Sequence, residues 1–448
     1  MGFLILPFIT PFLTNVDYGI YGIIFSLVTG ITVIKTLGLE IILMNSFIHH
    51  SHGRGFKIIW NEIQGFIFCW AIVLGVITSF LLYFILPVEA AKNIGKVIAL
   101  TIAPIIFYSS IQIISQKYYQ LAEQPIQIGI RALFFGIMTV GLNYYFIAIL
   151  RLGYLGWIWS NFISETFMFL SLIYPIWIKL RLLPNFLFRK AALKKHLKLS
   201  LPLVPHTSAF FLLDFSDRLV MLKLNVSTAN IGAYDFAYKF AGYARVFSES
   251  IHQASTPLLI KDFKRNNKTD FLKSIIFLEN YVVMFVSFLL ALWLKEIFHL
   301  MVKNDDLVNS YRIGVILTMS YAYKPMYTAM AAVFYYYEKT KEFWKISFIA
   351  GIVNIILNVI LIPIYGYEVA VITTFFAFLF IGYAGFYITK FKELYPYEFY
   401  PLRWIFYTCL LLVTCYLFKD SGVVTKALLT MLVLIFTLIN TFKILKRL

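Results

Sequence analysis

Five basic residues lie inside long apolar stretches of the sequence, where a charge is costly. They are Lys35, Arg218, Lys239, Arg245 and Lys324. At the centre of a bilayer a Lys or Arg side chain costs about 2.5 to 3.5 kcal/mol on insertion scales, so it is expected to be paired or to line a polar interior. Buried cations form strong, charge-assisted bonds with phosphate groups. These residues therefore predict a binding site for an anionic ligand.

Acidic neighbours offer a structural alternative for three of these cations, because residues i and i+4 share one face of a helix. The pairs at this spacing are Asp214 with Arg218, Asp235 with Lys239, and Arg245 with Glu249. Lys35 and Lys324 have no such neighbour. For these two the sequence favours a cation that faces an interior cavity. Snorkelling to the interface, or a pair with Glu40 or Glu165, is the alternative.

Tyrosines and carboxylates on the same segments complete the candidate site. The candidates are Tyr21, Tyr234 and Tyr238, whose rings could contact a sugar, and Asp214, Asp217 and Glu249, whose carboxylates could bind a sodium ion or a proton. Tyrosine rings can stack on sugars while their hydroxyl groups form hydrogen bonds, although the same residues could simply pack helices together. The sequence does not rank the acidic residues.

No catalytic residue, metal site or cofactor is predicted. His206 and His252 lie in apolar segments without a nucleophile–base motif such as G-x-S-x-G. The three cysteines lack metal-ligand spacing. The lack of a catalytic histidine motif disfavours an O-acyltransferase, and the short outer connections disfavour a membrane glycan polymerase, which should have a long outer loop with Arg residues. A multidrug or small-cation exporter is the other alternative, and it should carry acidic residues and few cations in its cavity.

The composition places the whole chain in a membrane. Of the 448 residues, 60% are hydrophobic and only 14% are charged, and the mean hydropathy is +0.80. Apolar segments roughly 20 residues long can each cross a bilayer as a helix. Counting them predicts an all-α, polytopic membrane protein with about fourteen transmembrane helices, arranged as two six-helix lobes plus two extra C-terminal helices.

The predicted domain boundaries are set by the apolar segments and by one basic connection. The N-terminal lobe covers residues 1–178, and its first helix is too short to span the bilayer, as if truncated. A basic cytoplasmic linker covers 179–200, the C-terminal lobe covers 201–389, and the two additional spans cover 390–448.

An internal repeat supports the two lobes. Gly19-Ile20-Tyr21 recurs as Gly232-Ala233-Tyr234, and Gly153-Tyr154 recurs as Gly366-Tyr367, both 213 positions later. Because both matches are displaced by the same number of positions, they indicate that the two halves of the chain are repeats of one unit.

The net charge of +17 could suggest a nucleic-acid partner, but the placement of the basic residues explains it. When alternate connections are assigned to the cytoplasm, most of the 39 Lys and Arg residues fall on that side. This is the asymmetry that the positive-inside rule expects. It predicts that both termini are cytoplasmic and that the chain has membrane lipid, not nucleic acid, as its partner.

Several short motifs are distributed along nearly the whole chain. In order they are Pro7, Pro11, Leu13, Tyr18-Gly19-Ile20-Tyr21, Leu201-Pro202-Leu203, Asp217-Arg218, Gly232-Ala233-Tyr234, Lys239, Pro257, Asn354, Asn358, Ile362-Pro363, Gly366, Ala370 and Thr374. Their order and spacing resemble those of the bacterial polysaccharide flippases, which translocate O-antigen or capsule repeat units. These proteins form part of the multidrug/oligosaccharidyl-lipid/polysaccharide (MOP) exporter superfamily.

The resemblance implies two six-helix lobes and a transporter that works by alternating access. Its substrate would be an undecaprenyl-diphosphate-linked oligosaccharide, carried from the cytoplasmic to the outer leaflet of the bacterial cytoplasmic (inner) membrane. The embedded cations would hold the diphosphate. A glycan polymerase and other polysaccharide-assembly proteins are the implied protein partners.

Overall fold

The computed structural model describes residues 5–50, 53–264, 271–337 and 340–446, and these residues form helices and connecting turns without strands. The chain divides into two compact units, Met1–Phe211 and Leu212–Leu448. The prediction of an all-α, polytopic membrane protein is confirmed. The predicted lobe boundary lay in the linker at 179–200, a little before the division that the structure shows.

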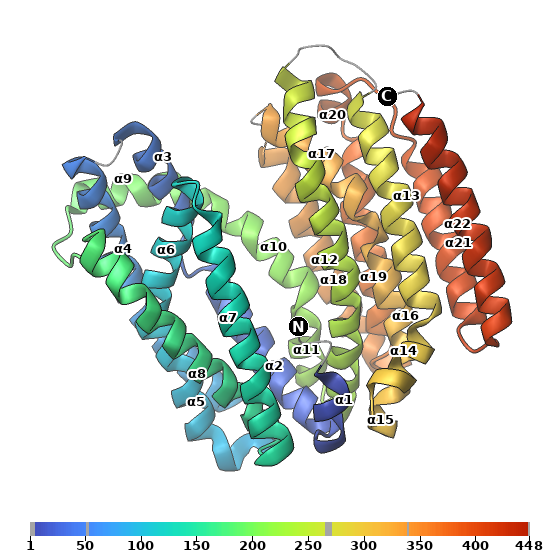
Figure 1. Cartoon of the computed structure of the whole chain (residues 1–448), viewed down its shortest axis with the longest axis horizontal. Coiled ribbons are helices and arrows are strands. Elements are labelled where there is room, and N and C mark those ends of the chain that lie inside the picture. Colours follow the sequence, from blue (N-terminus) through green and yellow to red (C-terminus); the bar gives the residue numbers. More distant parts are fainter. Residues whose placement is uncertain (1–4, 51–52, 265–270, 338–339, 447–448) are drawn as a thin grey trace. The chain divides into compact units, whose positions relative to one another are not determined.

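The N-terminal unit is a bundle of helices around α4, α6 and α8 (Figure 1). In chain order its helices are α1 (Leu6–Ile9), α2 (Asn15–Val33), α3 (Glu40–His50), α4 (Arg54–Ile85), α5 (Ile94–Ala103), α6 (Ser109–Leu121), α7 (Pro125–Asn143), α8 (Tyr154–Leu172) and α9 (Lys190–Ser200), followed by α10 (Val204–Asp214), which continues past the division. A π-helical turn, Pro104–Tyr108, joins α5 to α6.

The start of α2 is fixed by a capping box and by a bond to α8. Thr14 accepts a hydrogen bond from the N–H of Asp17, and the Asp17 carboxylate accepts one from the N–H of Thr14. The other carboxylate oxygen of Asp17 accepts a bond of 2.9 Å from the N–H of Tyr154, at the start of α8. These bonds hold the two helices together at one end.

The basic connection predicted as a linker is docked on α4. The Arg189 guanidinium donates to the buried Glu62 carboxylate at 2.8 Å, and the N–H of Asn185 donates to the carbonyl of Asn61. At Gly65 an added Cβ would lie 2.0 Å from the carbonyl oxygen of Asn185, so only glycine allows this approach. Part of the connection therefore packs against the bundle.

The C-terminal unit contains the longest helix of the described chain, α12, which packs against α13, α16 and α17 (Figure 1). Its helices are α11 (Ser216–Lys223), α12 (Thr228–Lys264), α13 (Phe271–Leu292), α14 (Leu294–Met301), α15 (Asp305–Val308), α16 (Tyr311–Ser320), α17 (Lys324–Tyr336), α18 (Thr340–Tyr365), α19 (Val369–Tyr383), α20 (Thr389–Leu394), α21 (Pro401–Phe418) and α22 (Val423–Leu445). The antiparallel pair α21 and α22 packs against α13.

Within the described residues, ten helical segments are long and apolar enough to cross a membrane. The segments predicted as spans that do not qualify include α11, α12 and the α16–α17 pair. Helix α11 is only eight residues long, and the charges on α12 and on the α16–α17 pair, among them Lys239, Arg245 and Lys324, lower the mean hydropathy of those helices. The count of fourteen therefore stays a prediction.

One predicted span is interrupted. The sequence predicts a helix over residues 18–46, whereas α2 ends at Val33 and α3 begins at Glu40. Leu37 and Gly38 between them have φ angles of +48° and +73°, which a continuous helix does not allow. Lys35 lies in this break.

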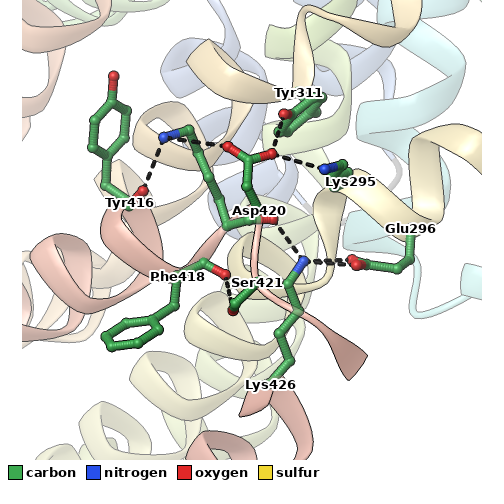
Figure 2. Close-up of polar contacts among 9 residues, drawn as sticks. Lys295, Glu296, Tyr311, Tyr416, Phe418, Asp420, Ser421 and Lys426 are labelled. Carbon is green, nitrogen blue, oxygen red and sulfur yellow. Dashed lines mark hydrogen bonds and ion pairs between the residues drawn. The ribbon is translucent and has the colours of Figure 1, made fainter. Parts of the chain in front are cut away.

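A polar cluster fixes the turn between α21 and α22 to α14 and α16 (Figure 2). Asp420 accepts hydrogen bonds from the Tyr311 hydroxyl at 2.5 Å and from the Lys295 ammonium at 2.9 Å. These bonds lower the pKa of Asp420 from 3.8 to about 2. The completely buried Lys426 donates to both carboxylate oxygens of Glu296, at 2.7 and 2.8 Å.

Glu296→Ala is expected to destabilise the protein far more than Asp420→Asn. The first change leaves the buried ammonium of Lys426 without its counter-charge, and breaking a buried pair costs on the order of 3 to 5 kcal/mol. Asp420 is about half exposed, so its pairs contribute little. Thermal unfolding of the purified variants in detergent measures both. Equal melting temperatures would contradict the role given to Lys426.

Candidate functional site

Four of the five predicted cations lie in the C-terminal unit, and each has an acidic neighbour. Arg218 is almost completely buried, and its Nε donates to Asp235 at 3.2 Å. Lys239 contacts the other carboxylate oxygen of Asp235 at 3.0 Å. The predicted pair of Asp235 with Lys239 is confirmed, and Arg218 shares the same carboxylate.

Neither of the other two candidate i,i+4 pairs forms a close ion pair among the described residues, although Arg245 and Glu249 still interact through their charges. Arg218 bonds the backbone carbonyl of Asp214 at 2.6 Å but not its carboxylate. The helix breaks at Phe215, between α10 and α11, so Asp214 and Arg218 do not share a regular helical face. The Asp214 carboxylate instead contacts Arg245 at 3.5 Å.

Glu249, the expected partner of Arg245, contacts Lys324 at 3.2 Å. Lys324 has no acidic residue four positions away in the sequence, and its acidic partner is Glu249. Its partner lies on α12, whereas Lys324 begins α17, and a contact between helices is not visible in sequence spacing. The C-terminal unit thus offers four cations, Arg218, Lys239, Arg245 and Lys324, together with four carboxylates, Asp214, Asp217, Asp235 and Glu249.

Asp217 is the most completely bonded carboxylate of this group. It is fully buried, and one oxygen accepts hydrogen bonds from Asn354 at 3.2 Å and Asn358 at 2.8 Å. The other oxygen accepts from the hydroxyl groups of Tyr234 at 2.5 Å and Thr374 at 3.0 Å. Four helices, α11, α12, α18 and α19, meet at this one side chain.

The tyrosines predicted to contact sugars separate into two environments. Tyr234 and Tyr238 are buried in the C-terminal unit and donate to Asp217 and Asp214, respectively. The Arg218 guanidinium lies over both rings, 5.1 and 4.1 Å from their centroids. Tyr21 lies in the N-terminal unit, where its hydroxyl accepts a bond from Asn161 at 3.0 Å.

Lys35 lies beside a cavity of the N-terminal unit. The cavity has a volume of about 220 Å³ and is lined by α2, α5, the π-helical turn, α6 and α8. Glu165 lines it too, close enough for the two charges to interact. Of the two predicted alternatives for Lys35, Glu165 is therefore the nearby acid, while Glu40 pairs with Lys117 at 3.3 Å.

Three of the four donors to Asp217, namely Asn354, Asn358 and Thr374, were not predicted as site residues from the sequence. Asn354 and Asn358 are four residues apart in an apolar segment, and this spacing places two carboxamides on one helix face. That signal was sufficient to find them as a pair, but their carboxylate partner lies on another helix. Among the residues with a described position, no group of three or more His, Cys, Asp or Glu side chains is arranged to hold a metal ion.

The chain shares its fold with solved structures of a lipid flippase and of multidrug transporters. The lipid II flippase MurJ in an inward closed conformation matches 100% of this chain and 99% of its own length, with a TM-score of 0.68 and 15% identity. An outward-facing multidrug resistance MATE family transporter of the MOP superfamily matches 86% of this chain and 88% of its own, with a TM-score of 0.54 and 14% identity. An inward-facing MATE family transporter of the same superfamily matches 91% of this chain and 95% of its own length, with a TM-score of 0.54 and 15% identity.

The sequence profile of a family described as polysaccharide biosynthesis protein matches residues 1–261, more than half of the chain. No curated protein matches the chain significantly. The family match confirms the resemblance drawn from the sequence motifs, and the structural matches show that the chain shares the fold of these proteins. The chain belongs to the polysaccharide biosynthesis protein family.

Proposed function

We propose that this chain is a flippase that carries an undecaprenyl-diphosphate-linked oligosaccharide from the cytoplasmic to the outer leaflet by alternating access. An O-antigen or capsule repeat unit is the substrate class. The family supports a role in polysaccharide synthesis, and the fold is that of the lipid II flippase and of the MATE transporters. Sugars and diphosphate need such a protein because they cannot be desolvated in hydrocarbon without a large cost.

The observation that carries this proposal is the incomplete bonding of Arg245. Its guanidinium has one contact of 3.5 Å with Asp214, and its Nε is buried without a hydrogen-bond partner in the described chain. A guanidinium presents five N–H donors in a planar fork that fits phosphate oxygens. Arg245 therefore has donors to spare for an anionic group.

Lys324 could bind the same anionic group if that group replaced its present partner, Glu249. The Lys324 side chain is 12% exposed, whereas its partner Glu249 is 43% exposed. A partly exposed ion pair contributes little free energy, so a diphosphate can replace the Glu249 carboxylate at modest cost. Lys239, which is 39% exposed beside the buried Asp235, can act in the same way. Arg218 is buried between its partners, so we assign it to positioning Asp235 and the tyrosine rings.

Asp217 is the favoured site for the coupling ion, which is a sodium ion or a proton. Asp214 and Glu249, the other two candidates, already contact Arg245 and Lys324. Asp217 has hydrogen-bond donors but no Lys or Arg within ion-pair distance among the described residues, and Asn354 Oδ1 is buried without a partner. Carboxylate, carboxamide and hydroxyl oxygens are ligands that suit a hard cation. Asp217, Asn354 and Thr374 would hold it.

Localisation in the bacterial cytoplasmic membrane with both termini in the cytoplasm is part of the same proposal. Membrane lipid surrounds the chain, and a glycan polymerase with other polysaccharide-assembly proteins would receive the product. The cationic residues make a multidrug exporter the weaker candidate, although this fold also serves such transporters.

Lys324→Gln and Arg245→Gln are each expected to weaken ligand binding by about ten- to a hundredfold, because a charge-assisted hydrogen bond contributes roughly 1.5 to 3 kcal/mol. Lys324→Arg keeps the charge and should retain part of the export. Surface glycan and accumulated lipid-linked intermediate are measured in cells, with membrane abundance determined in parallel. Lys92→Gln, in an exposed connection, is the matched control. Export at the parental rate by both Gln variants would exclude the proposed anion site.

A further inference from the structure

We propose that the cavity beside Lys35 binds a single neutral sugar ring of the transported molecule, and that it does not bind the diphosphate. The inference rests on the proposed function and names a site within the N-terminal unit. The polar residues that line the cavity are Tyr21, Thr32, Lys35, Thr101, Gln112, Asn161 and Glu165.

The charges of the cavity favour a neutral ligand. One ammonium, from Lys35, and one carboxylate, from Glu165, face the same space, so their charges cancel. An anion would be repelled by Glu165, and a cation by Lys35. Neither side chain forms a hydrogen bond or close ion pair with any residue that the structure describes. A ligand that both donates and accepts hydrogen bonds can bridge them.

Sugar hydroxyl groups have this property, since each donates one bond and accepts others. The Lys35 ammonium only donates, the Glu165 carboxylate only accepts, and the carboxamides of Gln112 and Asn161 do both. Neighbouring hydroxyl groups of one ring can therefore satisfy the cation and the anion together.

The cavity also has an aromatic wall. Tyr21 and Phe25 are one turn apart on α2, with ring centroids 6.1 Å apart and planes at 19°. Phe25 is 45% exposed although it lines the cavity. Aromatic faces can stack against the apolar face of a sugar, whereas a phosphate gains nothing from them.

The size limits the ligand to a small one. Pockets for drug-sized ligands have about 300 to 1,000 Å³, whereas this cavity has about 220 Å³. The cavity therefore has room for one ring, and further sugars of a chain would lie outside it. The π-helical turn Pro104–Tyr108, which contributes Pro104 and Ile105 to the wall, is of a kind often found at functional sites.

Binding is tested on the whole protein in lipid nanodiscs without sugar-based detergent, by saturation-transfer NMR. The probes are free glucose, galactose, rhamnose and N-acetylglucosamine, with inorganic diphosphate as a separate ligand. Phe25→Ala should abolish the signal from the sugar that binds, whereas Phe80→Ala, on the exposed face of α4, should leave it unchanged. The double variant Lys35→Gln with Glu165→Gln stays neutral and polar, so it should retain sugar binding within about tenfold.

Three results would overturn the proposal: no sugar of the panel binds, Phe25→Ala binds as the parent does, or inorganic diphosphate binds the parent and is lost in the double Gln variant. The last result would make the cavity an anion site. The measurement is independent of export in cells. If no sugar binds but export still requires Lys324 and Arg245, only the sugar site is disproved. If a sugar binds but export does not require Lys324 and Arg245, the proposed flippase mechanism is disproved.

Discussion

Asp217→Ala should prevent the protein from accumulating in the membrane. The change leaves four buried donors, on Tyr234, Asn354, Asn358 and Thr374, without their acceptor. Each buried donor left unsatisfied costs about 1 to 3 kcal/mol. The sum is comparable with the whole stability of a typical domain, about 5 to 15 kcal/mol.

Membrane abundance and thermal unfolding in detergent measure this effect. Asp306→Ala is the matched control, because Asp306 is an exposed carboxylate of the same unit. Asp217→Asn keeps the shape and one acceptor oxygen, so it should accumulate better than Asp217→Ala yet lose export if the carboxylate binds the coupling ion. Normal melting of Asp217→Ala would mean that the four bonds carry little free energy.

Arg218→Met is expected to lower the free energy of unfolding by on the order of 3 to 5 kcal/mol, because it removes one member of a buried ion pair. The guanidinium bonds Asp235 and the carbonyl of Asp214, and it lies over two tyrosine rings. Arg218→Lys keeps the charge but loses the planar fork and the stacking, so it should recover only part of the stability.

A double-mutant cycle separates the ion pair from the packing. Arg218→Met combined with Asp235→Asn should be more stable than the sum of the single losses predicts, by roughly 0.5 to 3 kcal/mol, because the two residues are in contact. Additive losses in thermal unfolding would show that Arg218 acts through the tyrosine rings and not through Asp235.

The sequence was informative about the class of the molecule and less so about its contacts. Apolar length and composition are local properties, so the all-α, polytopic membrane protein could be predicted from them and is confirmed. The charged residues within the apolar segments could also be identified from the sequence. Their partners could not, because Asp214 meets Arg245 and Glu249 meets Lys324 through helix packing that no spacing rule describes.

Two further features show where a helix-based interpretation failed. The break before Glu40 was signalled by Gly38, but the apolar run on both sides outweighed that glycine. Lys35 lies beside the cavity at this break, because α2 ends at Val33, just before the lysine. Three of the donors to Asp217, Asn354, Asn358 and Thr374, lie more than a hundred positions after it in the sequence, so this convergence appears only in the folded chain.

The cluster at the turn of α21 and α22 has a mechanical consequence. The turn is attached to α14 and α16 through Glu296, Lys295 and Tyr311, and the pair also packs along α13 (Figure 2). Attachment at the tip and along the side leaves the hairpin little freedom to swing by itself. The hairpin is therefore expected to move together with these three helices, so a fluorophore at the exposed Leu432 on α22 would report their motion.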